Sequence, residues 1–148
     1  MTNGVIKTYT KFTDTLGITM VLLLVFQYVL GMFTALYIEI PEETSGWQFM
    51  GSSMVLISHV TLGILLAGVS IWLLAASIMK RSGTWIVSSA LGLAGILLSL
   101  MTGSAFMNDQ SDNNSFLMAL GLAISLLAYS AGIYLSSTSR NTTDSARK

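Results

Sequence analysis

Four long apolar segments are the feature that most limits how this chain of 148 residues can fold. They cover approximately residues 16–38, 53–78, 85–107 and 116–135. Each is close to the ~20 residues that a helix needs to cross the hydrocarbon core of a bilayer. Charged residues make up only 9% of the chain, whereas soluble domains contain about 25%. The sequence therefore predicts an all-α integral membrane protein, a four-helix bundle of residues 16–136 with antiparallel, up-down topology.

The cationic side chains predict the orientation of this bundle. They precede the first segment, follow the fourth or lie between the second and third: Lys7, Lys11, Lys80, Arg81, Arg140, Arg147 and Lys148. The other two connections contain no Lys or Arg. Because cytoplasmic loops of membrane proteins carry an excess of Lys and Arg, we expect both termini in the cytoplasm. The predicted location is the cell membrane, with four crossings.

The two ends of the chain differ from the segments between them. Residues 1–15 carry apolar side chains at helical spacing, which predicts a short amphipathic helix on the cytoplasmic surface. A frayed polar lead-in is the alternative for this short stretch. Residues 137–148 are polar and contain few apolar side chains, so they are expected to form a disordered cytoplasmic tail.

Small and polar residues recur at steps of three and four in each segment, so they share one helix face. Small residues let membrane helices approach closely, and these faces are therefore expected to point inward. The first segment has Gly17, Met20, Leu24, Gln27, Gly31 and Thr34 on this face, and the second has Leu56, His59, Gly63, Ala67 and Ser70. The third has Ser88, Gly92, Gly95, Ser99 and Thr102, and the fourth has Gly121, Ser125, Ala128, Gly132 and Ser136.

His59 is the only histidine of the chain, and it lies inside the second apolar segment. Ionisable groups at membrane depth are costly and usually mark functional sites. Gln27 is also at membrane depth, where its amide needs a partner within the protein. Met32 and Met101 lie about as deep as His59, so each is a candidate second axial ligand if His59 binds a haem iron. Histidine with methionine is an ordinary pair of haem ligands.

Two short motifs carry a resemblance to known membrane proteins. His59-x-x-Leu62-Gly63, after a first segment that contains Gly31, resembles the small four-helix b-type cytochrome bundles and the halves of haem A synthase. Gly31-Met32-Phe33 and the segment 103–106 are similar to motifs of an uncharacterised family of archaeal and bacterial four-span proteins. The resemblance implies a pocket for b-type haem formed by Gln27, Gly31 and Gly63, with His59 as axial ligand and electron transfer or haem handling as the role. Such bundles generally contain two or more histidines, whereas this chain has one.

Three interpretations of His59 stay open at this stage. The first is the haem site, and the second is a cofactor-free accessory or scaffold subunit in which His59 is a buried hydrogen-bonding group. The third is an ion or proton path, which the absence of Asp and Glu from the four predicted segments disfavours. No enzyme signature is present, and no basic patch indicates nucleic-acid binding. The expected partners are the lipid bilayer and other membrane subunits or a second copy of the chain.

Overall fold

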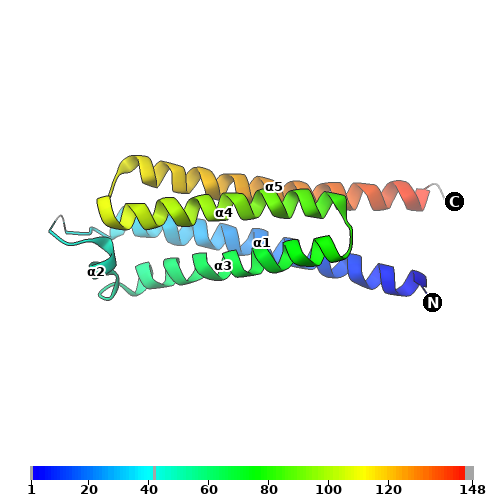
Figure 1. The fold of residues 1–148 in the computed structure, drawn as a ribbon, viewed down its shortest axis with the longest axis horizontal. Coiled ribbons are helices and arrows are strands. Elements are labelled where there is room, and N and C mark those ends of the chain that lie inside the picture. Colours follow the sequence, from blue (N-terminus) through cyan, green and yellow to red (C-terminus); the bar gives the residue numbers. More distant parts are fainter. Residues whose placement is uncertain (1, 42, 146–148) are drawn as a thin grey trace.

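The structure, a computed structural model, describes residues 2–41 and 43–145, with side chains in residues 13–41 and 43–139. This part of the chain forms five helices and no strand (Figure 1). The helices are α1 (Thr2–Tyr37), α2 (Gly46–Met50), α3 (Met54–Met79), α4 (Gly83–Asp109) and α5 (Asp112–Ser145). The fold is therefore all-helical, as the sequence predicts.

Four of these helices are long and apolar enough to cross a membrane. The stretches that meet this criterion are Thr13–Tyr37, Met54–Met79, Gly83–Asp109 and Asp112–Ser139. Each coincides with one of the four apolar segments of the sequence to within four residues at either end. The chain thus has the helices of a multi-pass membrane protein.

Both outer helices are longer than the sequence predicts. α1 starts at Thr2 and is continuous with the first apolar segment, so the expected amphipathic segment of residues 1–15 is not a separate helix within the described residues. Its side chains before Thr13 lie outside the described part. α5 continues to Ser145, where a disordered tail from residue 137 is expected. The reason is local, because no Gly or Pro follows Gly132 to end the helix.

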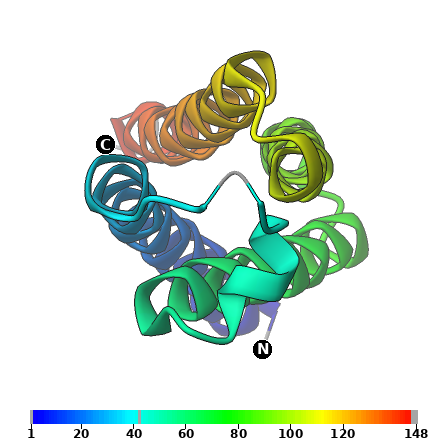
Figure 2. The ribbon, with the colours of Figure 1, turned by 90° about the vertical axis from the view of Figure 1, so that its left-hand side faces the viewer.

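The four long helices form a ring in which each contacts two neighbours. α1 packs on α3 and α5, while α4 packs on α3 and α5. Figure 2 shows this ring in a view along the helices, and the contact between α4 and α5 is the most extensive. Both chain ends lie at the end of the bundle where α3 turns into α4 (Figure 1). We call this the turn end, and the opposite end the α2 end.

Small residues explain the close contact of α4 with α5. A Cβ atom added to Gly95 would lie 2.5 Å from the carbonyl oxygen of Gly121, and the converse substitution would meet the Gly95 carbonyl at the same distance. Ser125 Oγ donates a hydrogen bond to the Gly92 carbonyl at 2.9 Å, and Ser99 Oγ donates to Met118 O at 2.8 Å. The predicted small-residue faces of these two segments are thus confirmed as their packing faces.

The bundle interior between its two ends is mainly apolar. The buried core residues are Met20, Leu24, Leu66, Leu73, Trp85, Ile96 and Tyr129. Ser70 Oγ of α3 and Tyr129 Oη of α5 share a hydrogen bond of 2.5 Å across this core. The predicted inward face of the first segment is confirmed, since Met20, Leu24 and Gln27 are all buried.

The short helix α2 packs against the end of α4. Gly46 allows this contact, because a Cβ atom there would lie 3.1 Å from Met107 Cα. The helix begins with a capping box, in which the Ser45 side chain accepts from Gln48 N and the Gln48 side chain accepts from Ser45 N. Ser53 caps α3 by accepting a hydrogen bond from Leu56 N at 3.3 Å. The start of α3, and with it the position of His59, is thereby fixed.

Candidate functional site

The central contact of the candidate site joins Gln27 of α1 to His59 of α3. Gln27 is only 8% exposed. Its Nε2 donates a hydrogen bond to the backbone carbonyl of His59 at 3.0 Å and lies 3.5 Å from His59 Nε2. We call these two residues the His59 pair. Two side chains predicted from sequence to be functional are therefore brought together across the α1–α3 interface.

Two glycines make room for the His59 pair. A Cβ atom at Gly31 would lie 3.0 Å from His59 Cε1, so the imidazole packs directly against the backbone of α1. A Cβ atom at Gly63 would lie 3.4 Å from Gln27 Nε2. The structure thus groups four of the six predicted site residues, namely Gln27, Gly31, His59 and Gly63.

The hydrogen bonds of Gln27 determine the tautomer that we assign to His59. The amide nitrogen must face the His59 backbone carbonyl, because the amide oxygen would be repelled there. The remaining amide N–H is then directed to His59 Nε2, which can only accept it if that nitrogen is unprotonated. The proton of the neutral imidazole therefore belongs on Nδ1.

Two buried atoms of the His59 pair lack hydrogen bonds. Within the described residues, neither Gln27 Oε1 nor His59 Nδ1 has a partner. With the assigned tautomer, one is an acceptor and the other is a donor. Buried polar groups are nearly always satisfied, and an exception requires an explanation. This unsatisfied donor and acceptor distinguish the His59 pair from the other polar contacts of the interior described here.

The two methionines predicted as axial ligands lie elsewhere on the helix surfaces. Met101 is 72% exposed and Met32 is 41% exposed, whereas the His59 ring is packed against Gly31. An axial ligand must direct its sulfur at the same iron as His59. The sequence places both residues at a similar depth to His59, but depth does not determine the face of the helix.

The His59 pair does not fit a haem in the packing that the structure shows. The Nε2 lone pair, through which histidine would bind iron, is directed at the Gln27 amide. The ring edge that carries Cε1 abuts the Gly31 backbone. A haem would therefore have to displace Gln27 and separate α1 from α3.

A second polar cluster lies at the turn end and was missed by the sequence analysis. Asp14 Oδ1 accepts hydrogen bonds from Trp85 Nε1 at 3.3 Å and from Ser136 Oγ at 2.9 Å. A Cβ atom at Gly17 would lie 2.9 Å from Trp85 Cζ3, and one at Gly132 would lie 3.2 Å from the same atom. We call Asp14, Gly17, Trp85, Gly132 and Ser136 the Trp85 cluster. It joins α1, α4 and α5.

The membrane-length stretch of α1 contains one acidic residue that lies outside the predicted segment 16–38. The membrane-length stretch of α1 begins at Thr13, so it includes Asp14, which the sequence analysis assigned to residues 1–15. Lys80, in the turn between α3 and α4, is electrostatically coupled to this carboxylate. Desolvation lowers the pKa of Lys80, and the negative charge of Asp14 opposes that shift. The sequence contained one signal for this cluster: Asp14 lies one helical turn before Gly17, and therefore on the same inward face of the helix.

The two polar clusters are separated by the apolar core. Met20, Leu24, Leu66 and Leu73 are at most 1% exposed. Ser70 and Tyr129 hydrogen-bond to each other within this apolar layer. This pair by itself does not form a continuous series of polar groups between the two clusters. A proton path would need a continuous series of polar groups or waters between the clusters. The packing of these core residues therefore disfavours the ion or proton path.

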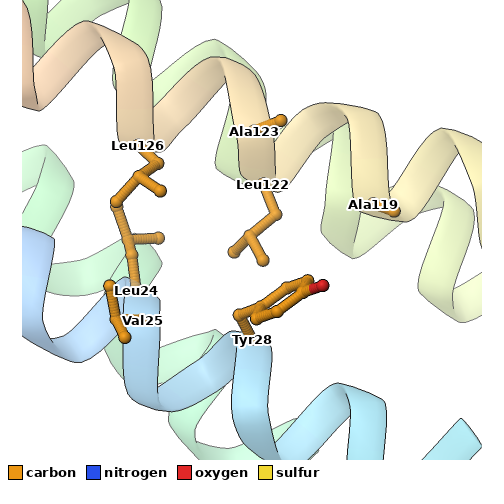
Figure 3. A pocket seen from close by; sticks show the side chains of 7 residues that line it. All are labelled: Leu24, Val25, Tyr28, Ala119, Leu122, Ala123 and Leu126. Atoms are coloured by element: carbon orange, nitrogen blue, oxygen red, sulfur yellow. The ribbon is translucent and has the colours of Figure 1, made fainter.

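The described surface hollows lie away from the His59 pair. A shallow apolar hollow of about 180 Å³ lies between α1 and α5, where Leu24, Val25 and Tyr28 face Leu122 and Leu126 (Figure 3). A polar hollow at the α2 end is lined by residues 43–45 and 108–110. Within the described residues, no group of three His, Cys, Asp or Glu side chains is placed to hold a metal ion.

Comparison with family models, curated proteins and solved structures finds no match for this chain. The similarity to b-type cytochrome bundles and to haem A synthase therefore remains a prediction from short motifs. The functional argument rests on the geometry of the His59 pair and the Trp85 cluster.

Proposed function

We propose that this chain is a non-enzymatic, cofactor-free accessory or scaffold subunit of a membrane complex. Its four long helices cross the cell membrane in antiparallel, up-down order, with both termini in the cytoplasm. The observation that supports this role most is how the interior polar side chains are used. Asp14, Ser125 and Gln27 each hydrogen-bond another helix, so these groups join helices and do not line a passage.

The proposed orientation of the helices in the membrane is based on the positions of the Lys and Arg residues, and cysteine labelling tests it directly. The native sequence contains no cysteine, so a single introduced thiol reports one position. Ser111→Cys, between α4 and α5, should react with a membrane-impermeant maleimide added outside intact cells. Ser82→Cys, between α3 and α4, should react only after the cells are opened. The reverse labelling pattern would overturn the proposed orientation.

Binding of b-type haem through His59 is the second candidate function. The observation in its favour is that neither imidazole nitrogen makes a short hydrogen bond, since Nδ1 has no partner among the described residues and Nε2 has only the 3.5 Å contact with Gln27. The close contact with Gly31 and the exposure of Met32 and Met101 oppose it. Electron transfer or haem handling would be the corresponding role.

An absorption spectrum separates the two candidates. The full chain is expressed with ample haem, purified, and measured before and after reduction with dithionite. A cofactor-free subunit gives no Soret band in either state. A Soret band that disappears in His59→Ala would contradict the proposal and establish the haem site. Gly68→Ala is the matched control, because a Cβ atom there has no heavy atom within 4 Å.

A further inference from the structure

Tyr28 places a hydroxyl group in the otherwise apolar hollow between α1 and α5. Figure 3 shows its ring beside Leu122, with the hydroxyl oxygen at the end nearer Ala119. Within the described residues, this hydroxyl makes no hydrogen bond. Hydrocarbon offers no acceptor, and the tyrosines of membrane proteins are enriched at the interfaces with water. The Tyr28 hydroxyl therefore requires an acceptor from the molecule that occupies the hollow.

The position of the hollow along α5 indicates the depth of that acceptor. The membrane-length stretch Asp112–Ser139 has 28 residues, more than the ~20 that the hydrocarbon core requires. Residues 112–115 are all polar, so the hydrocarbon begins near Phe116. Ala119 is three residues further along α5, about 4.5 Å deeper at 1.5 Å per residue. The hydroxyl end of Tyr28 thus lies just below the hydrocarbon boundary, at the α2 end of the hollow.

The rest of the hollow extends deeper into the membrane and is apolar. Its lining on α5 continues from Ala119 to Leu126, a rise of about 10 Å. Leu24 and Val25 of α1 face this part (Figure 3). The volume of about 180 Å³ is too small to enclose a helix, which is about 10–12 Å across, but it suits a single chain. The occupant should therefore carry an acceptor at its α2 end and hydrocarbon below it.

We propose that this hollow binds one acyl chain of a membrane phospholipid, whose ester carbonyl accepts a hydrogen bond from Tyr28 Oη. A diacyl lipid in the leaflet at the α2 end has its ester carbonyls on the head-group side and its methylene groups below them. This order matches the Tyr28 hydroxyl and the apolar lining beneath it. Ala119 and Ala123 line the hollow with short side chains and so leave room for the chain. The inference rests on the membrane crossing of the proposed function and goes beyond its scaffold role.

Native mass spectrometry of the full chain, delipidated in detergent, tests the inference with two matched lipids. One is a diacyl phosphatidylcholine, and the other is its diether analogue, which has the same chains and head group but no ester carbonyl. The native chain should bind one diester molecule at its tightest site, and should bind it more tightly than the diether. Tyr28→Phe should weaken diester binding about two- to tenfold, the range expected for one hydrogen bond, and leave diether binding unchanged.

Tyr134→Phe is the matched control for the loss of a hydroxyl group, because Tyr134 is exposed on α5 and does not line the hollow. It should change the binding of neither lipid. If Tyr28→Phe weakens both lipids equally, or affects neither, the proposed hydrogen bond to an ester carbonyl is overturned.

Ala123→Leu tests the hollow itself by filling it. It should weaken the binding of both lipids, whereas Ala94→Leu, on the exposed surface of α4, should leave both unchanged. Unchanged binding in Ala123→Leu would overturn the assignment to the hollow, and so would a dimer of the native chain that excludes both lipids. If Ala123→Leu does not fold, the comparison of the two lipids with Tyr28→Phe still decides the proposal. Cysteine labelling at Ser111 and Ser82 reports the membrane crossing separately, so the two proposals fail distinguishably.

Discussion

The Trp85 cluster and the His59 pair are both polar contacts between helices, but they are completed in different ways. In the Trp85 cluster, the indole N–H and the Ser136 hydroxyl both donate hydrogen bonds to Asp14. Two glycines leave room for the indole ring, because a Cβ atom at either one would lie too close to it. In the His59 pair, a donor and an acceptor remain unsatisfied within the described residues. A contact in which each polar atom has a partner is expected to stabilise the fold more than one in which a buried donor and a buried acceptor lack partners. The turn end should therefore contribute more stability than the interface nearer α2.

Removing the Trp85 side chain should have the largest effect on stability. Trp85 is 2% exposed, and truncation of a buried Trp typically costs about 3–5 kcal/mol of unfolding free energy. Trp72→Ala is the matched control, because Trp72 is 65% exposed on α3. Its effect should be about 0.5 kcal/mol or less, as for substitutions on a surface. The unfolding free energies are measured in a reversible unfolding assay in bicelles. Equal losses for the Trp85 and Trp72 variants would contradict the stabilising role of the Trp85 cluster.

Enlarging Gly17 should have the next largest effect. The added methyl group of Gly17→Ala overlaps the Trp85 ring, and overpacking of this kind costs about 1–3 kcal/mol. Gly31→Ala meets His59 Cε1 at 3.0 Å and should cost less, because the His59 ring is not fully enclosed. Gly68→Ala has space and should stabilise α3 by about 0.5–1 kcal/mol. A larger loss at Gly31 than at Gly17 would reverse the assignment of stability to the turn end.

Neutralising Asp14 should affect both stability and the titration of Lys80. Asp14→Asn keeps an acceptor for Trp85 and Ser136 but replaces charged hydrogen bonds by neutral ones, a loss of about 1 kcal/mol. The carboxylate raises the pKa of Lys80 against the opposing effect of desolvation. The pKa of Lys80 should therefore fall further below its ordinary value when the charge is removed. NMR titration of methylated lysines measures this shift, and Asp112→Asn at the other end is the control. An unchanged or higher Lys80 pKa would contradict the coupling.

Substituting Gln27 should have the smallest effect on stability. Gln27→Leu removes a hydrogen bond to the His59 carbonyl, but it also removes a buried acceptor that has no partner in the described structure. These contributions oppose each other, so the unfolding free energy should change by less than about 1 kcal/mol. The same bicelle assay applies, with Leu24→Ala as a reference for a buried apolar residue on the same face. A loss as large as that of Leu24→Ala would show that the Gln27 hydrogen bond stabilises the bundle as much as buried apolar packing does, and would contradict this prediction.

Much of the fold follows from the sequence, because helical periodicity identifies the faces that pack. Gly92, Gly95, Gly121 and Ser125 recur at steps of three and four, and these residues form the α4–α5 contact. Gln27 and His59 share the inward faces of their segments and meet as a consequence. Periodicity fixes the direction of each side chain around its own helix. It therefore predicts which residues face the bundle interior.

The rest depends on long-range contacts that one helix does not encode. Asp14 lies 71 residues from Trp85 and 122 from Ser136 in the sequence. The spacing of Asp14 from Gly17 indicates that the carboxylate faces inward, but nothing near Asp14 identifies an indole N–H as its partner. Met32 and Met101 were chosen because their expected depth is similar to that of His59, but depth does not determine the helix face, and both side chains are exposed. The continuation of α5 to Ser145 was missed because polar composition was taken to indicate disorder.

Double-mutant cycles on both clusters test the difference in their contributions to stability most directly. Asp14→Leu is combined with Trp85→Phe, and Gln27→Leu is combined with His59→Phe, with unfolding free energies measured in the same bicelles. Residues that share a hydrogen-bond network couple by about 0.5–3 kcal/mol. The account predicts a coupling of about 1 kcal/mol or more between Asp14 and Trp85, and one below about 0.5 kcal/mol between Gln27 and His59. A stronger coupling in the His59 pair than in the Trp85 cluster would contradict it.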